Sequence, residues 1–346
     1  MENAQHKAQI IAPQWRTQIL QWYDKHGRKH LPWRNLTGQS AAYGVYISEI
    51  MLQQTQVKRV LQSFYTPFMQ AFPTLQALAQ APLESVLKMW EGLGYYTRAR
   101  HLHKAAQTCV VKYNGALPCD YALLRELSGI GAYTAGAILC FGFGQSVAFV
   151  DGNIKRLLCR IFALQTPKDS ELQLLANLLL DTESSFNYNQ ALLDIGALLC
   201  TPKSPACLLC PLQALCGGKH NPTLYPRKQK RILQNLDLHL ALCTRAQSIA
   251  LVKSEQALYH GLYNLPYMIE SKRDSEILGH FKHHYTKYKI TAFVYRARED
   301  DIEPAQGLCF IPLSQLDSIP LSALCKKALT LANQKQSFNK IQYALK

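Results

Sequence analysis

The stretch LSGIGAYTA, residues 127–135, decides how the first part of the chain folds. Two glycines, Gly129 and Gly131, flank Ile130 between two helical runs. Glycine permits a tight turn and leaves backbone N–H groups at the start of the second helix open to a phosphate, while isoleucine can pack beneath the turn. A lone Gly-x-Gly between helices is most often a plain turn. The whole pattern is far more specific, and it predicts a helix-hairpin-helix over about residues 122–142.

Apolar residues at helical spacing surround this motif, from the N-terminus to about Cys216. One stripe consists of Val57, Val60, Leu61, Phe64, Tyr65 and Phe68, and another of Leu172, Leu175 and Leu179. Residues 1–216 are therefore predicted to form a mainly α domain.

Residues 217–234 read GGKHNPTLYPRKQKRILQ, a composition of glycine, proline and basic residues that is typical of a linker. Beyond it the apolar period drops towards two in residues 236–243 and 290–295, and a closing helix is expected over 321–333. Residues 235–346 are predicted to form a smaller α+β domain around a mixed sheet.

The formal charge of +15 over 346 residues favours a polyanionic partner such as nucleic acid. The eleven cysteines are an odd number, and the start MENAQHKAQIIAPQW has no basic and apolar leader pattern, so a reducing, cytoplasmic compartment is expected. Apolar stretches such as 135–150 are short and broken by glycines, which argues against membrane insertion.

Four cysteines form the sharpest local signal, spaced Cys200-x6-Cys207-x2-Cys210-x5-Cys216. Zinc modules usually carry two short Cys-x2–4-Cys knuckles, and only Cys207 and Cys210 are so spaced. The wider flanking gaps suit a larger cubane, so a [4Fe-4S] cluster is favoured over zinc, and zinc over ordinary buried cysteines. The cluster loop is predicted at residues 200–216.

Two carboxylates stand out. Asp151, in VDGNIKR (150–156), is placed to start a helix, where it would be a common N-cap and could also stabilise a sugar cation. Glu49, in SEIMLQQTQV (48–57), lies in an otherwise apolar helix. Desolvation there would raise its pKa into the range of a general acid, although a surface glutamate is the plainer alternative.

Together these residues resemble the MutY-type adenine DNA glycosylases of the endonuclease III superfamily. The resemblance spans residues 15–216 and includes LPWR (31–34), GLGYY (92–96), VDGN (150–153), the hairpin and the four cysteines. It implies base-excision repair: monofunctional hydrolysis of the N-glycosidic bond of adenine mispaired with 8-oxoguanine or guanine, by a monomer on double-stranded DNA with a [4Fe-4S] cluster.

The resemblance also implies roles for individual residues. Glu49 would protonate the flipped adenine, and Asp151 would stabilise the oxocarbenium-like sugar. The other residues with implied roles are Tyr133 and Asn153 at the reacting centre; Trp33, Arg34, Leu52 and Gln190 in the adenine pocket; Gln54, Thr55, Leu93 and Tyr95 against the orphaned lesion; Gly129 and Gly131 on the DNA; and Cys200, Cys207, Cys210 and Cys216 on the cluster.

The C-terminal domain resembles the family's Nudix-like lesion-recognition domain more loosely. No Nudix box is present, so pyrophosphate hydrolysis is not expected. Where the family has an aromatic-Ser-His loop, this chain has Tyr285-Thr286-Lys287, and Thr286 keeps the hydroxyl for lesion contact.

Two rival interpretations remain. A bifunctional glycosylase-lyase of the same fold would carry a nucleophilic lysine where Tyr133 stands and would lack Glu49. Lys155 lies near the expected site and could at most trap sugar aldehyde in a side reaction. A non-catalytic DNA-binding protein would explain the charge, hairpin and cysteines, but not why Glu49, Tyr133 and Asp151 occur together.

Overall fold

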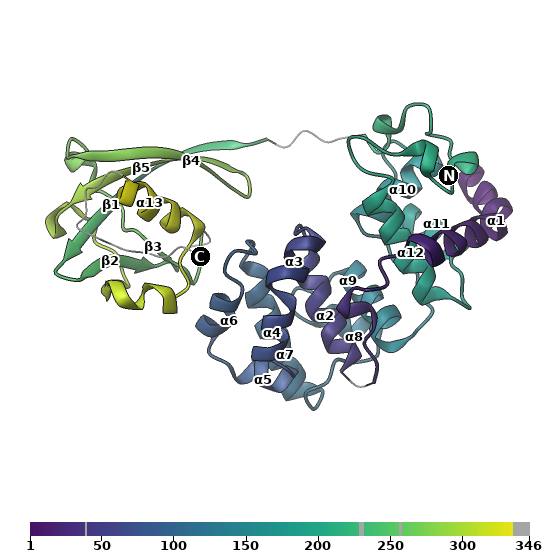
Figure 1. Cartoon of the computed structure of the whole chain (residues 1–346), viewed down its shortest axis with the longest axis horizontal. Helices are drawn as coiled ribbons and strands as arrows, with labels where there is room; N and C mark the ends of the chain where they lie inside the picture. The colour runs from purple at the N-terminus through teal and green to yellow at the C-terminus, as the bar shows by residue number, and fades with distance from the viewer. Residues whose placement is uncertain (39, 228–231, 256–257, 335–346) are drawn as a thin grey trace. The chain divides into compact units, whose positions relative to one another are not determined.

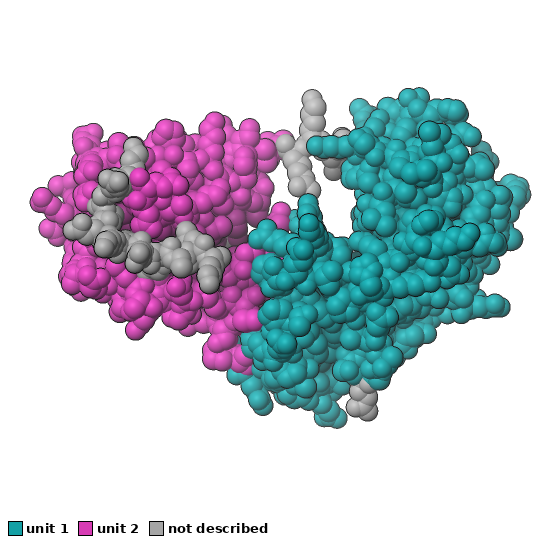
Figure 2. All heavy atoms as spheres, in the orientation of Figure 1, with its two compact units in different colours: residues 1–80, 100–229 teal, residues 81–99, 230–346 magenta. Residues whose placement is uncertain are grey.

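The computed structural model of the chain describes residues 1–38, 40–227, 232–255 and 258–334. Its contacts divide the chain into two compact units, residues 1–80 with 100–229 and residues 81–99 with 230–346 (Figure 2). Part of the expected linker, 228–231, and the C-terminal end of the expected second domain, 335–346, lie outside the described residues.

The first unit is helical, as the apolar spacing predicts (Figure 1). Its helices are α1 (Glu2–His26), α2 (Ala41–Leu52), α3 (Val57–Ser63), α4 (Tyr65–Ala71), α5 (Leu75–Gln80), α7 (Thr97–Lys112, whose first turn falls in the second unit), α8 (Tyr121–Glu126), α9 (Ala132–Ala137), α10 (Gly152–Ile161), α11 (Asp169–Leu179) and α12 (Ser185–Leu198). Short turns of 3-10 helix lie at η1 (Pro32–Arg34), η3 (Cys207–Leu209), η4 (Gln213–Leu215) and η5 (Pro222–Leu224), and a π-helical turn, η2, covers Ile138–Gly142.

The N-terminal helix α1 packs against α11 and α12. Trp15 is fully buried there, and its indole N–H donates a 2.9 Å hydrogen bond to the hydroxyl of Tyr188. The predicted stripe of Leu172, Leu175 and Leu179 on α11 is also fully buried. Burying each such side chain stabilises the fold by roughly 1.5–3 kcal/mol. This contact therefore holds α1 against α11 and α12.

The stripe from Val57 to Phe68 does not form one continuous helix. It divides at Phe64 into α3 and α4, although Val60 and Phe68 are both fully buried. Pro67 favours this break, because a proline inside a continuous helix lacks an N–H and its ring clashes with the carbonyl of residue i−4, although the long helix α1 accommodates Pro13 in its interior. In the first turn of α4 the proline is tolerated.

The helix-hairpin-helix is formed by α8 and α9. Gly129 has φ +79°, and a Cβ there would meet His101 Cβ at 2.6 Å, so only glycine fits this turn. Ile130 is 4% exposed beneath it, as expected. Gly131, the N-cap residue of α9, has open space on its side-chain face.

Within its described residues, the second unit contains a six-stranded mixed sheet of order β3-β2-β1-β5-β4, with β6 paired to β2. Its elements are α6 (Leu83–Met89), β1 (Gln234–Arg245), β2 (Ser248–Lys253), β3 (Tyr263–Asn264), η6 (Glu270–Lys272), β4 (Ile277–Tyr285), β5 (Tyr288–Ala297), η7 (Glu299–Asp301), β6 (Leu308–Pro312), η8 (Leu313–Ser318) and α13 (Ala323–Gln334). The pair β1 and β5 is parallel, whereas β4 and β5 form an antiparallel hairpin.

Both expected strands are present. The one expected at 236–243 is β1 and the one expected at 290–295 is β5, and each is longer than predicted at both ends. The closing helix α13 begins at Ala323, two residues later than expected, because the Ser322 hydroxyl accepts the N–H of Cys325 and caps the helix. In the part of the chain that the structure describes, no helix combines the length and apolar character needed to cross a membrane.

Candidate active site

The centre of the site is a contact between Glu49 on α2 and Tyr133 on α9. The Tyr133 hydroxyl donates a 2.5 Å hydrogen bond to Oε2 of Glu49, across 84 residues of sequence. Glu49 is 5% exposed, and the helix around it is buried from Ala41 to Met51. The Tyr133 ring is held from the side by the ring of Phe149, at a centroid distance of 5.4 Å. A carboxyl group is thus fixed in an apolar setting.

Burial raises the pKa of Glu49 to about 7. The hydrogen bond from Tyr133 and the charge of Arg34 lower this pKa, and the nearby carboxylate of Asp151 raises it. Burial is the largest of these effects, because removal of water penalises the ionised form. A substantial fraction of Glu49 is therefore protonated near neutral pH, as a general acid requires.

Asp151 is the N-cap residue of α10. Its Oδ1 accepts the N–H of Ile154 at 2.6 Å, and its Oδ2 accepts Nδ2 of Asn153 at 2.8 Å. The expected capping geometry is present. Burial raises the pKa of Asp151, and the hydrogen bonds from residues 153 and 154 oppose that rise without cancelling it. Asp151 therefore ionises less readily than it would if only the capping hydrogen bonds acted on its carboxyl group.

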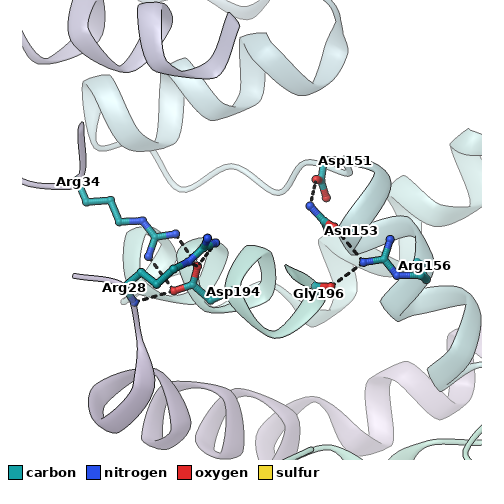
Figure 3. Close-up of polar contacts among 7 residues, drawn as sticks. All are labelled: Arg28, Arg34, Asp151, Asn153, Arg156, Asp194 and Gly196. Atoms are coloured by element: carbon teal, nitrogen blue, oxygen red, sulfur yellow. Dashed lines mark hydrogen bonds and ion pairs between the residues drawn. The ribbon is translucent and has the colours of Figure 1, made fainter. Parts of the chain in front are cut away.

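A chain of contacts runs from Asp151 through Asn153 to Arg156 and the carbonyl of Gly196 (Figure 3). Arg156 also contacts the first residue of the cysteine loop. Nη2 of Arg156 donates to Oδ1 of Asn153 at 2.9 Å and to the carbonyl of Gly196 at 2.6 Å, and Nε donates to the carbonyl of Cys200 at 2.6 Å. Because the guanidinium can only donate, it fixes Oδ1 of Asn153 towards itself and Nδ2 towards Asp151.

A second cluster of charges holds Arg34. Asp194 on α12 is completely buried and accepts both Nη atoms of Arg34, at 2.8 and 2.7 Å, in a bidentate pair. It also accepts the backbone N–H and Nε of Arg28, each at 2.8 Å (Figure 3). Burial acts to raise the pKa of Asp194, but its contacts with the two arginines lower the pKa overall. This cluster ties η1 to α12.

Of the four residues expected in the base pocket, Trp33 and Gln190 are 4% and 3% exposed. Trp33 stands edge-on to Tyr65, at a ring distance of 5.1 Å. Gln190 lies one helical turn before Asp194 on α12, so it occupies the same face of the helix as the residue that binds Arg34. Leu52 is the last residue of α2, close in sequence to Glu49.

The turn after α2 carries two of the residues expected to face the lesion. Gln54 is exposed and has φ +59°, which few non-glycine residues adopt. The preceding Gln53 holds the turn against α9, because its Nε2 donates to the Thr134 hydroxyl at 3.3 Å. Thr55 is partly buried, with its hydroxyl 3.5 Å from the carbonyl of Gln53.

Leu93, Tyr95 and Thr286 belong to the second unit, whereas Glu49 belongs to the first. Tyr95 is 43% exposed with φ +51°, whereas Leu93 is 6% exposed. Thr286 is exposed at the turn of the β4–β5 hairpin, again with a positive φ of +51°.

The four cysteines of residues 200–216 line one cavity together with Leu157 and Arg160. Nη1 of Arg160 donates to Sγ of Cys200 at 3.2 Å, and the thiol of Cys216 lies near the Lys7 ammonium. Four thiols in one cavity with neighbouring cations are a donor set that fits an anionic iron-sulfur cubane. Among the described residues, no group of three or more His, Cys, Asp or Glu side chains is arranged to hold a single metal ion.

Sequence reasoning did not identify Asp194, Arg28 or Arg156. Asp194 lies four residues after Gln190 in an apolar helix, and a lone acid in such a helix is the same signal that points to Glu49. Arg156 follows directly in the VDGNIKR stretch, but its partners Gly196 and Cys200 are at least 40 residues away.

Known proteins resemble this chain in both sequence and fold. Residues 47–180 match the family model described as HhH-GPD superfamily base excision DNA repair protein. An adenine DNA glycosylase of Buchnera aphidicola subsp. Baizongia pistaciae is 38% identical over 279 residues, which cover 78% of each chain. The human adenine DNA glycosylase is 44% identical over 216 residues, 59% of this chain and 39% of the human one. The solved structure of a thermostable thymine-DNA glycosylase matches with TM-score 0.55 and 25% identity, covering 62% of this chain and 97% of that one.

Proposed function

The chain belongs to the adenine DNA glycosylases of the HhH-GPD superfamily, base-excision repair enzymes, and from this premise we propose that it hydrolyses the glycosidic bond of adenine mispaired with 8-oxoguanine or guanine. The observation that carries the proposal is the buried pair of Glu49 and Tyr133. A surface glutamate without a catalytic role would have neither this burial nor a pKa near 7.

In the proposed reaction Glu49 gives a proton to the flipped adenine, which makes the base a better leaving group. Tyr133 donates its hydroxyl hydrogen to Oε2, which leaves Oε1 of Glu49 to carry the transferable proton. Breaking the bond leaves positive charge on the sugar, and the carboxylate of Asp151 stabilises that charge. Asn153 orients this carboxylate through its 2.8 Å hydrogen bond.

The adenine pocket is proposed to consist of Trp33, Arg34, Leu52 and Gln190. Both Arg34 and Gln190 are almost completely buried. Nε of Arg34 is buried without a hydrogen bond of good geometry within the described part of the chain, although the Tyr23 hydroxyl lies close to the same guanidinium, and this Nε is proposed to donate to the base. A buried donor of this kind discriminates between bases more strongly than an apolar wall does.

The enzyme is proposed to be monofunctional. A glycosylase-lyase needs an amine nucleophile at the sugar, and the phenol of Tyr133 stands where such enzymes carry their lysine. Lys155 is the nearest lysine in sequence to Asp151, and its ammonium is paired with Asp169 at 2.8 Å. Water is therefore the proposed final nucleophile.

The second unit is proposed to be a Nudix-like recognition domain. Exposed Thr286 on the β4–β5 hairpin and exposed Tyr95, together with Leu93, Gln54 and Thr55, would contact the orphaned 8-oxoguanine. Gly131 at the start of α9 leaves room for a phosphate of the same duplex. The enzyme is proposed to act on this DNA as a monomer in the cytoplasm.

Cys200, Cys207, Cys210 and Cys216 are proposed to hold a [4Fe-4S] cluster, which when bound would fix the shape of the loop that follows α12. Arg160 and Lys7 would balance its negative charge from α10 and α1. The support is the shared cavity of the four thiols and the family to which the chain belongs.

The test is strand cleavage by alkali after incubation with duplexes that carry adenine opposite 8-oxoguanine, guanine or thymine. Alkali-labile sites should form at the first two mispairs and not opposite thymine, and Glu49→Gln should form none. No alkali-labile site at either mispair would refute the proposed substrate. Cleavage without alkali would mean that the enzyme is a lyase.

A further inference from the structure

The loop of residues 90–96, here called the wedge loop, contains both Leu93 and Tyr95. It joins α6 to α7 along the chain, but residues 81–99 form part of the compact unit built on the C-terminal sheet. Three of its residues have positive φ: Gly92 at +97°, Gly94 at +75° and Tyr95 at +51°. Tyr95 is the non-glycine residue among them, and such a residue keeps a left-handed backbone only where its surroundings hold it.

Some of these contacts are internal. The indole N–H of Trp90 donates to the carbonyl of Gly94 at 3.2 Å, and Trp90 is fully buried. Nη2 of Arg98 donates to the same carbonyl at 3.1 Å, and its guanidinium lies 5.3 Å from the Trp90 ring centroid and 5.7 Å from that of Tyr95. These contacts hold the loop in its observed shape.

Glu91 supplies the connection to the sheet. One carboxylate oxygen pairs with the ammonium of Lys88 at 2.6 Å, and the other pairs with Lys326 on α13, also at 2.6 Å. The Glu91 side chain is 12% exposed, so water screens these pairs less than at an open surface. Lys88 in turn donates to the carbonyl of Ile319 at 3.3 Å.

The helix α13 that carries Lys326 packs against β4 and β5, whose hairpin ends in Thr286. Burial raises the pKa of Tyr96, and the charges of Glu91 and Tyr285 add to the rise, so this phenol lies within electrostatic reach of both. Tyr285 itself stacks obliquely on Tyr259, with ring centroids 4.4 Å apart.

We infer that Lys326 is a positioning residue for lesion discrimination, which through Glu91 holds the wedge loop in a fixed relation to the β4–β5 hairpin. This inference rests on the proposed function. Leu93 and Tyr95 of the wedge loop then share one framework with Thr286 of the hairpin, whereas the other two residues proposed to probe 8-oxoguanine, Gln54 and Thr55, lie in the first unit. Discrimination between 8-oxoguanine and guanine depends on that framework, whereas base removal depends on Glu49 and Asp151 in the other unit.

The test compares Lys326→Glu with Lys327→Glu. Both variants change the net charge equally on the same helix, but Lys327 is exposed and its ammonium lies 6.0 Å from the Phe281 ring centroid. In Lys326→Glu a second carboxylate faces Glu91 and repels it. Amide hydrogen exchange in peptides covering residues 90–98 should become faster in Lys326→Glu and stay at the wild-type rate in Lys327→Glu.

Single-turnover excision provides the functional readout. For Lys326→Glu the ratio of rates opposite 8-oxoguanine and guanine should fall roughly fivefold, the scale of one partly exposed ion pair. Lys326→Arg should keep the ratio. In a Glu91→Gln background, Lys326→Glu should lower the ratio no further, because the repelling charge is gone. If Lys326→Glu fails to fold, Lys326→Met takes its place, with the same direction expected.

Equal exchange in the Lys326→Glu and Lys327→Glu variants would overturn the inference, and so would an unchanged excision ratio with faster exchange. Failure of the proposed function would look different. The wild-type chain would then excise no adenine from either duplex, while the exchange measurement would still report on the contact between Glu91 and Lys326.

Discussion

The guanidinium of Arg156 donates to Oδ1 of Asn153 at 2.9 Å, and this contact decides which way the amide points. With Oδ1 fixed, Nδ2 can only face Oδ2 of Asp151, 2.8 Å away. The same guanidinium is anchored by the carbonyls of Cys200 and Gly196. The orientation of the proposed charge-stabilising carboxylate therefore depends on the backbone at the start of the cysteine loop.

Arg156→Gln should lower the single-turnover excision rate by about tenfold or more, because a hydrogen bond to a charged group contributes roughly 1.5–3 kcal/mol. Binding of uncleaved duplex should change much less. Lys25→Gln is the matched control, since it removes one positive charge from an exposed position on α1 and should keep the wild-type rate. A rate equal to that of the control would mean that Asn153 needs no such support.

Asp194→Asn should destabilise the helical unit by about 3–5 kcal/mol, because it leaves the buried charge of Arg34 without its partner. The measurement is urea unfolding followed by helical circular dichroism. Asp24→Asn serves as the control: its pair with Lys29 is exposed, and its loss should cost less than about 1 kcal/mol. Similar losses in both variants would contradict the role assigned to Asp194.

The local parts of this site could be predicted from the sequence, since each depends on neighbouring residues. The turn at Gly129 and the cap at Asp151 follow from conformational preferences that act over a few positions. The break between α3 and α4 at Phe64 is also favoured by a nearby residue, Pro67, but the apolar spacing by itself predicts one continuous helix there.

Contacts between distant residues could not be predicted in this way. The pair of Glu49 and Tyr133 is separated by 84 positions, and that of Arg34 and Asp194 by 160. Nothing in the composition of residues 81–99 indicates that they pack with the C-terminal sheet, because their partners, such as Lys253 for Glu84 and Lys326 for Glu91, are 169 or more residues away.

The purified protein should be brown and contain about four iron and four sulfide per chain, as expected for a cubane held by four thiolates. Cys207→Ser should lower the iron content, whereas Cys119→Ser, at an exposed cysteine outside the loop, should not. Colourless protein with stoichiometric zinc would exclude the proposed cluster.

Asp151→Asn should lower the single-turnover rate by about a hundredfold or more while binding to adenine opposite 8-oxoguanine remains tight. Asparagine caps helices as well as aspartate does, so α10 should begin at the same residue and only the negative charge is lost. Circular dichroism should confirm unchanged helix content. An excision rate close to that of the wild type would remove Asp151 from the reaction.

The pH dependence of single-turnover excision should report on Glu49. Because the proton donor must be protonated, the rate should fall as pH rises through the pKa of about 7. Below that pKa the rate should be constant only while Asp151 stays ionised, and it should fall again at acid pH where that carboxylate takes up a proton. Glu49→Gln should lose at least about a hundredfold in rate and show no alkaline limb.

Tyr133→Phe gives the sharper test of how this pKa is set. The Tyr133 hydroxyl favours the ionised form of Glu49 and so lowers its pKa; without it the pKa should rise, and the alkaline limb should move to higher pH. The rate on the acid plateau can fall at the same time, since phenylalanine no longer orients Oε2, but the direction of the shift does not depend on that loss. A limb that stayed in place, or moved to lower pH, would mean that the titrating group is not the carboxyl that Tyr133 contacts.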